Sequence, residues 1–146
     1  MGAISELVIA GIDEAASIAA SDCPTRSWKG IVWRTIDPVK LGTLWGILSG
    51  AAEEQVTGLI SQIRLVHGNK KDGPWVHHVP EKLRDLLADL AGQDESEILV
   101  VSSRWAATDE LQGWDPANVE ALLRDVADTA DTARLQKKQL LLWITL

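Results

Sequence analysis

Phenylalanine and tyrosine are absent from this chain of 146 residues, and cysteine and methionine each occur once. The lone Cys23 excludes an internal disulfide and any metal site built from several cysteines, and it favours a reducing compartment. The longest apolar run, Leu140 to Ile144, is far shorter than the roughly 20 residues of a membrane-spanning helix. The first residues also lack the basic region of a secretory signal. We therefore expect a cytoplasmic protein without a membrane span.

Motifs of known chemistry are missing as well. The chain contains no G-x-S-x-G, H-E-x-x-H, P-loop or G-x-G-x-x-G pattern. The spacing of His67, His77 and His78 matches no established metal motif. An alternative is a three-ligand site made of His67, one of the adjacent pair His77 and His78, and Asp72. Adjacent carboxylates are typical of solvated helix ends, and they occur at Glu53/Glu54, Asp94/Glu95/Glu97 and Asp109/Glu110. The sequence predicts no catalytic residue, no metal site and no cofactor.

The charge is acidic and unevenly placed. The net charge is −7, and residues 74–146 contain 13 acidic and seven basic side chains. All 13 acids lie between Glu81 and Asp131. Such a surface repels phosphate backbones, which argues against nucleic-acid binding, and it attracts a basic protein partner. The alternative is that these acids only keep the helices soluble.

Several segments of the first half have clear local signals. Ile4 to Ala10 is a predicted strand, followed by a short helix to about Ala20, with Asp13 as its cap and Ile12 facing inward. Trp28 to Ile36 is apolar at both parities and predicts a strand that is partly buried on both faces. Asp37-Pro38 begins a helix that ends at Gly50. Gly42, Gly46 and Gly50 recur every four residues, which favours close packing against another helix or a strand.

The middle of the chain is harder to interpret. Residues 51–58 are consistent with a helical turn or a loop, and residues 59–67 alternate weakly, as a strand would. Residues 68–74 are a turn cluster, and residues 75–79 are a short predicted strand. Pro80 then begins a helix with leucines at ideal spacing, which ends at Gly92. Residues 93–111 fit a helix or a strand, and we favour the helix.

The end of the chain has the clearest pattern. Asp115-Pro116 begins a long helix whose apolar residues form one continuous stripe. The final QLLLWITL run predicts a central strand that is buried on both faces. We therefore expect one globular domain, residues 1–146, of the α+β class. It has a mixed or antiparallel sheet packed by about four to five helices, and its C-terminal strand is buried.

The most distinctive segment is R-W-A-A-T-D-E-L-Q-G-W-D-P, residues 104–116. Its tryptophans flank an acidic turn, and tryptophan and arginine are enriched at interface centres. It is our candidate partner-binding surface, made of Arg104, Trp105, Asp109, Glu110 and Trp114. The alternative is that the two tryptophans hold the connection on the core.

Three further segments carry a resemblance to a known group: IDPVKLGTLWGILSG, RWAATDEL and KKQLLLWITL. The chain is similar to the YfbM-like proteins, small bacterial proteins of unknown function. The resemblance covers about half the chain, and it implies a bacterial cytoplasmic α+β protein with no assigned activity.

These observations support three hypotheses of function. The first is a non-enzymatic protein-binding module, such as an immunity-type protein that neutralises a basic toxin. The second is a small-molecule binder or an enzyme with an unrecognised tryptophan-lined site. The third is a homo-oligomeric structural protein, such as a homodimer.

Overall fold

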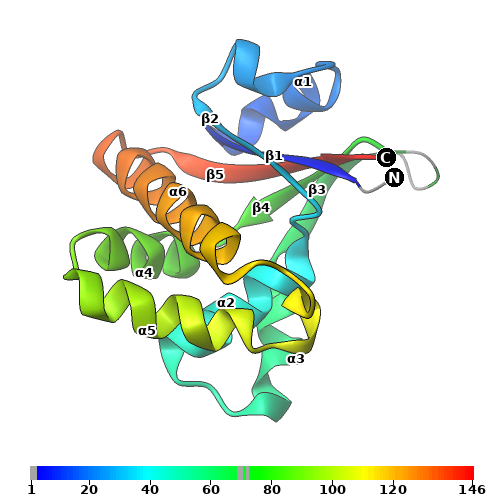
Figure 1. Cartoon of the computed structure of the whole chain (residues 1–146). Coiled ribbons are helices and arrows are strands. Elements are labelled where there is room, and N and C mark those ends of the chain that lie inside the picture. The colour runs from blue at the N-terminus through cyan, green and yellow to red at the C-terminus, as the bar shows by residue number, and fades with distance from the viewer. Residues whose placement is uncertain (1–2, 69–70, 72) are drawn as a thin grey trace.

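The computed structural model describes residues 3–68, 71 and 73–146 and has an α+β architecture (Figure 1). Five antiparallel strands form one sheet: β1 (Ile4–Ala10), β2 (Gly30–Arg34), β3 (Arg64–Gly68), β4 (Trp75–Val79) and β5 (Gln139–Thr145). The described residues form six α-helices: α1 (Ala15–Ala19), α2 (Pro38–Ser49), α3 (Glu53–Gln62), α4 (Glu81–Ala91), α5 (Glu95–Ala106) and α6 (Pro116–Leu135). Short 3₁₀ turns are η1 (Ile12–Glu14), η2 (Pro24–Arg26) and η3 (Asp109–Leu111). The predicted α+β class and antiparallel sheet are confirmed.

The strand order β2-β1-β5-β4-β3 places the C-terminal strand at the centre of the sheet. β5 pairs with β1 along its whole length and with β4 on its other side. Leu140, Leu141 and Leu142 are all fully buried. The prediction of a central strand buried on both faces is therefore confirmed, and its physical basis is a covering layer on each side.

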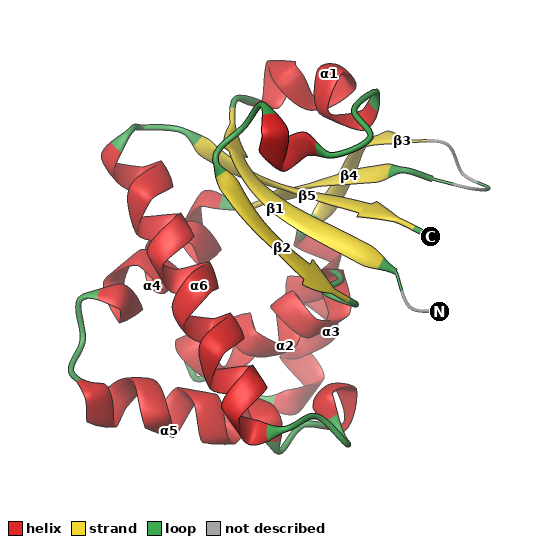
Figure 2. Cartoon of the chain, turned by 45° about the horizontal axis from the view of Figure 1, so that its top comes forward, coloured by secondary structure: helices red, strands yellow, loops and turns green. Residues whose placement is uncertain are grey.

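The two faces of the sheet are covered by helical layers of different size. On one face, Leu140 and Leu142 join a large core with α2, α4, α5 and α6. On the other face, Leu141 and Trp143 pack with Ala15 and Ile18 of α1 in a smaller cluster. The figures show α1 and its flanking turns alone on this second side, which we call the cap face (Figure 2).

Local capping explains where two helices begin. A carboxylate oxygen of Asp37 accepts a hydrogen bond from Lys40 N at 2.9 Å, and Asp115 accepts one from Ala117 N at 2.9 Å. Pro38 and Pro116 occupy first-turn positions where no backbone donor is lost. Gly50 ends α2 at φ 67°, a conformation that glycine adopts without strain. Both predicted Asp-Pro helix starts are confirmed, as is the helix that we favoured within residues 93–111.

α3 was predicted only in part, because residues 51–58 fit a helical turn or a loop and a strand was expected from residue 59. Residues 59–62 are its last turn, so the predicted strand over residues 59–67 is wrong there and begins only at Arg64. Helix forms because α2 offers a glycine row on which α3 packs. A Cβ atom on Gly42 would overlap Ile60, and one on Gly46 would lie 2.9 Å from Val56 Cγ2. The prediction of close packing is confirmed for Gly42 and Gly46 and is wrong for Gly50, where a Cβ would meet nothing within 4 Å.

Two further predictions in the first half need correction. Ile12 is 48% exposed rather than inward, and Glu14, not Asp13, closes the first turn by accepting from Gly11 N at 3.1 Å. β2 is a short edge strand, and Val32 on its cap face is 52% exposed. The small cap does not extend over the sheet edge, so one face of β2 stays open. The predicted turn at residues 68–74 lies partly outside the described residues, at 69–70 and 72.

Candidate functional site

The five residues proposed from sequence lie at the end of α5 and in the 107–115 connection to α6. Trp105 is fully buried, and its indole Nε1 donates to the carbonyl oxygen of Lys40 at 3.1 Å. It therefore holds α5 on α2 and contributes no surface. Arg104, Asp109 and Glu110 are exposed, and Trp114 is half-buried.

Asp109 and Glu110 border a hollow of about 540 Å³ between the 107–115 connection and helices α2 and α3. We call it the acidic hollow. It is lined by Thr43, Glu53, Val56, Thr57, Ile60, Ala107, Thr108, Asp109 and Glu110. Three of these carry carboxylates, and no lysine, arginine or histidine is among these described residues. A cationic group in the hollow would meet negative charge from two separate elements.

Hydrogen bonds hold the acidic rim in place. Thr108 Oγ1 donates to the carbonyl oxygen of Trp105 at 2.6 Å, and Gln112 N donates to the carbonyl oxygen of Asp109 at 3.2 Å. Buried Leu111 anchors η3 between these two bonds. Glu53 could not be assigned to this site from the sequence, because residues 51–58 fitted a helical turn or a loop and the approach of α3 to the connection joins segments far apart in the chain.

Trp114 borders a second hollow, which lies between β2 and the start of α6. We call it the tryptophan hollow. Its volume is about 490 Å³, and it is lined by Val32, Trp33, Arg34, Thr35, Trp114 and Asn118. Trp33 Nε1 donates to a carboxylate oxygen of Asp125 at 3.1 Å, which orients the indole along α6. Trp114 was predicted as a site residue and Trp33 was not, since nothing local in the sequence links β2 to the start of α6.

Many other acids of the helix layer are paired with arginine. Arg124 bonds both Glu95 and Glu120, and Arg134 bonds both Asp89 and Asp131. The hydrogen bond from Arg124 lowers the pKa of Glu95 below its usual range. Hydrogen bonds from Ser96 and the Glu97 backbone do the same for the pKa of Asp94. The pairs Arg124–Glu95 and Arg134–Asp89 join α6 to α5 and α4, and Asp94 caps α5.

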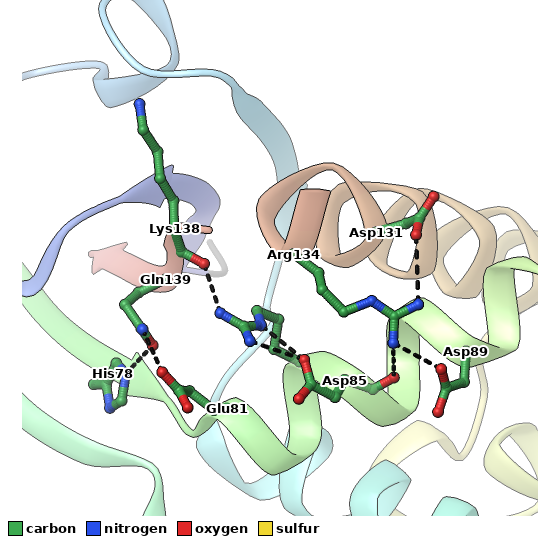
Figure 3. A network of polar contacts seen from close by, with 9 residues as sticks. His78, Glu81, Asp85, Asp89, Asp131, Arg134, Lys138 and Gln139 are labelled. Carbon is green, nitrogen blue, oxygen red and sulfur yellow. Dashed lines mark hydrogen bonds and ion pairs between the residues drawn. The ribbon is translucent and has the colours of Figure 1, made fainter. Parts of the chain in front are cut away.

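A polar network where β5 begins also has a structural role (Figure 3). Gln139 Nε2 donates to Glu81 Oε1 at 2.8 Å, so its amide oxygen faces His78 Nε2 at 2.9 Å. Because an amide oxygen can only accept, Nε2 of His78 carries the proton. Arg84, which is 9% exposed, donates to the carbonyl oxygen of Lys138 at 2.8 Å. The network fastens the central strand to α4.

The histidines and the cysteine do not form a reactive centre within the described residues. Burial lowers the pKa of His77, which keeps its ring neutral at neutral pH. No group of three or more histidine, cysteine or acidic side chains suited to a metal occurs there, and Asp72 lies outside these residues. Cys23 Sγ lies 4.0 Å from a carboxylate oxygen of Glu6, whereas reactive cysteines have positive surroundings.

Comparisons with known proteins identify no relative from which a function could be proposed. No protein-family model, curated protein or solved structure matches the chain. Within the described residues, every helix is too short or too polar to cross a bilayer.

Proposed function

We propose that this chain is a protein-binding module that takes a basic segment of a partner protein in the acidic hollow. One observation carries the proposal: Glu53, Asp109 and Glu110 come together from two elements around a concave surface without a basic lining residue. Five acids elsewhere in the helix layer pair with arginine, whereas the three around this hollow form no ion pair among the described residues.

The geometry favours recognition of lysine or arginine. The rim is held by hydrogen bonds and by buried Trp105, so little order has to be gained on binding. Exposed carboxylates speed the encounter with a basic partner and make the complex sensitive to salt. Thr43, Thr57 and Thr108 offer hydroxyl acceptors beside them.

The finer proposal is an immunity-type protein that neutralises a basic toxin. The small size, the net charge of −7 and the absence of catalytic motifs from the sequence support it. The resemblance to YfbM-like proteins of bacteria stays a prediction beside it.

The test uses acetylated hexalysine amide as the probe and a double variant, Asp109→Lys with Glu110→Lys. Isothermal titration should show binding to the wild type that weakens as salt rises, and a loss of roughly tenfold or more in the variant. Asp13→Lys with Asp22→Lys is the matched control, since it changes net charge equally at exposed positions on the cap side. Equal losses in both variants would mean that only net charge matters, and would overturn the proposal.

The tryptophan hollow supports a second candidate function, the binding of a small planar apolar ligand. Trp33 and Trp114 line the same hollow of about 490 Å³ and offer stacking surfaces. A ligand that binds there stabilises the folded state and changes tryptophan fluorescence. Thermal-shift screening of the wild type against Trp114→Leu tests this candidate: hits that persist in the variant bind elsewhere.

A further inference from the structure

We propose that the free edge of β2 binds an extended, basic segment of a partner protein as an added strand of the sheet. β2 is the outermost strand beside β1 (Figure 2). The inference goes beyond the proposed function, because it concerns another surface and stands even if the acidic hollow binds nothing.

The backbone of β2 presents hydrogen-bonding groups outward. The carbonyl oxygen of Lys29 accepts from Ile9 N at 2.8 Å, and Thr35 N donates to the carbonyl oxygen of Ala3 at 2.9 Å. In an antiparallel ladder the groups alternate, so residues 29, 31, 33 and 35 face β1. Residues 30, 32 and 34 therefore face away from it. The backbone N–H and carbonyl of Val32 therefore point out of the sheet, where an added strand would pair with them.

Two hollows lie along this edge, on the face that carries α6. The tryptophan hollow adjoins Trp33, and a smaller hollow of about 180 Å³ adjoins Gly30 and Ile31. Ile31 and Trp33 point to the same face, about 7 Å apart. An added strand would place alternate side chains opposite them, one in front of each hollow. Such pockets for alternate side chains give strand addition its specificity.

The charge along the edge favours a basic occupant. Asp125 lies beside Trp33, and Asp128 borders the smaller hollow; both are exposed carboxylates of α6. Two bases also lie along the edge, since Lys29 borders the smaller hollow and Arg34 the tryptophan hollow. Arg34 has the parity of Val32, so its side chain leaves the sheet on the cap face. No ion pair joins either base to Asp125 or Asp128 among the described residues. An acidic segment would meet both carboxylates, whereas a lysine or arginine opposite Ile31 would lie between them.

A second copy of this chain fits the edge less well. Pairing β2 with β2 would bring two α6 helices together on the same face, with Asp125 and Asp128 of each copy side by side. Like charges at such a seam oppose association, and each copy has a net charge of −7.

The other free edge, β3, is a poorer template. A bulge interrupts its pairing with β4 between Leu65 and His67. Bulges twist an edge away from a regular ladder and protect it from further pairing. β2 pairs with β1 in unbroken register. A hollow also borders Arg64 and Val66 of β3, so the two edges differ in the regularity of their backbone, which only β2 keeps among the described strands at the edges.

The probe is the peptide acetyl-Thr-Lys-Thr-Trp-Thr-Lys-Thr-amide, titrated into the full chain. Its side-chain order is the same from either end, so both strand directions put tryptophan opposite Trp33 and lysine opposite Ile31. We expect backbone amide exchange to slow at Val32 and Arg34, which face outward. The amides of Ile31 and Trp33, already bonded to β1, should change little. Replacing both peptide lysines by glutamate should abolish this protection.

The matched variants are Val32→Pro and Val32→Thr. Proline removes the outward N–H without loss of a bond to β1, and edge strands accept it at such positions. We expect the dissociation constant to rise roughly threefold to tenfold for proline and to stay within about twofold for threonine. If the proline variant does not fold, a peptide N-methylated at alternate residues tests the same bonds from the ligand side.

Three outcomes would overturn the inference. The first is that the peptide does not bind at about 1 mM, which is a weak limit for recognition. The second is binding that leaves amide exchange at Val32 and Arg34 unchanged, and the third is a free protein that is already dimeric through these amides. The variant with Asp109→Lys and Glu110→Lys should bind this peptide like the wild type. Failure of hexalysine binding together with intact edge binding would reject the acidic hollow alone.

Discussion

The acidic residues of this protein are used in two different ways. Within α4, α5 and α6, acids pair with Arg84, Arg124 and Arg134, and these contacts join helices to one another and to β5. In the acidic hollow, Glu53, Asp109 and Glu110 have no basic neighbour among the lining residues. A high acidic content therefore says little by itself, since the position of the arginines decides which carboxylates remain for a partner.

The largest effect on stability is expected when the central strand β5 is removed, because the chain should then no longer fold. Deleting residues 142–146 removes buried Leu142 and Trp143 and breaks the ladders to both β1 and β4. We expect no cooperative unfolding transition in circular dichroism. Deleting Leu146 alone, which is 81% exposed, should leave the melting curve close to that of the wild type. A cooperative melt of the longer deletion would refute the central role of β5.

The next largest effect on stability is expected from replacing Arg84, the buried arginine of α4. Arg84→Leu removes the hydrogen bonds of a buried guanidinium to the Lys138 carbonyl and to Asp85. Such losses cost about 2 kcal/mol of unfolding free energy. Arg104→Leu, at an exposed position in α5, should cost less than about 0.5 kcal/mol. Urea unfolding measures both, and equal costs would show that burial is not what separates these arginines.

Acid should lower the unfolding free energy through the carboxylates at the start of α5. The pKa values of Asp94 and Glu95 are lowered in the folded state, so the unfolded chain binds more protons there as the pH falls. Their contribution is present above the ordinary carboxyl pKa of about 4 and is lost as the pH drops through the lower folded values. We expect the unfolding free energy to fall below about pH 4.5.

Two variants test the cause of that acid dependence. Glu95→Gln removes the titrating group, and Arg124→Gln removes its hydrogen-bond donor, so both should make the loss of stability with acid shallower. Urea unfolding from pH 7 to pH 3 measures the slope (about the range where carboxylates titrate). An unchanged slope in both variants would contradict the link between this pair and stability.

The smallest effect on stability is expected in the acidic hollow. Asp109→Lys with Glu110→Lys replaces two exposed side chains that form no ion pair among the described residues. The unfolding free energy should stay within about 0.5 kcal/mol of the wild type. A loss above about 1 kcal/mol in thermal unfolding is a typical cost for a structural position. Such a loss would show that these acids stabilise the fold, as the acids paired with arginine do.

Local signals were sufficient for much of the fold. Asp37-Pro38 and Asp115-Pro116 each place a capping carboxylate and a first-turn proline at a helix start, and both are confirmed. The apolar run at the C-terminus predicted a central strand, because burial on both faces leaves no polar alternation to detect. Such signals depend on neighbours in the chain, so sequence reasoning can find them.

Contacts between distant segments were beyond that reasoning. α3 is a helix because its Val56 and Ile60 fit the glycine row of α2, and the open face of Val32 reflects how far the cap reaches. The candidate site was predicted in part: Asp109, Glu110 and Trp114 border hollows, while Trp105 belongs to the core. The partners Glu53 and Trp33 come from elements far away in the sequence.

By itself, the sequence determined the class of the fold, the capped helices α2 and α6, the central strand and the acidic balance. These follow from local hydrogen bonding, the period of apolar residues and the count of charges. Only the tertiary structure decided which acids pair with arginine, which tryptophans share a hollow and which edge of the sheet is regular and open. Packing decides these features, because it brings together side chains whose distance in space has no counterpart in their spacing along the chain.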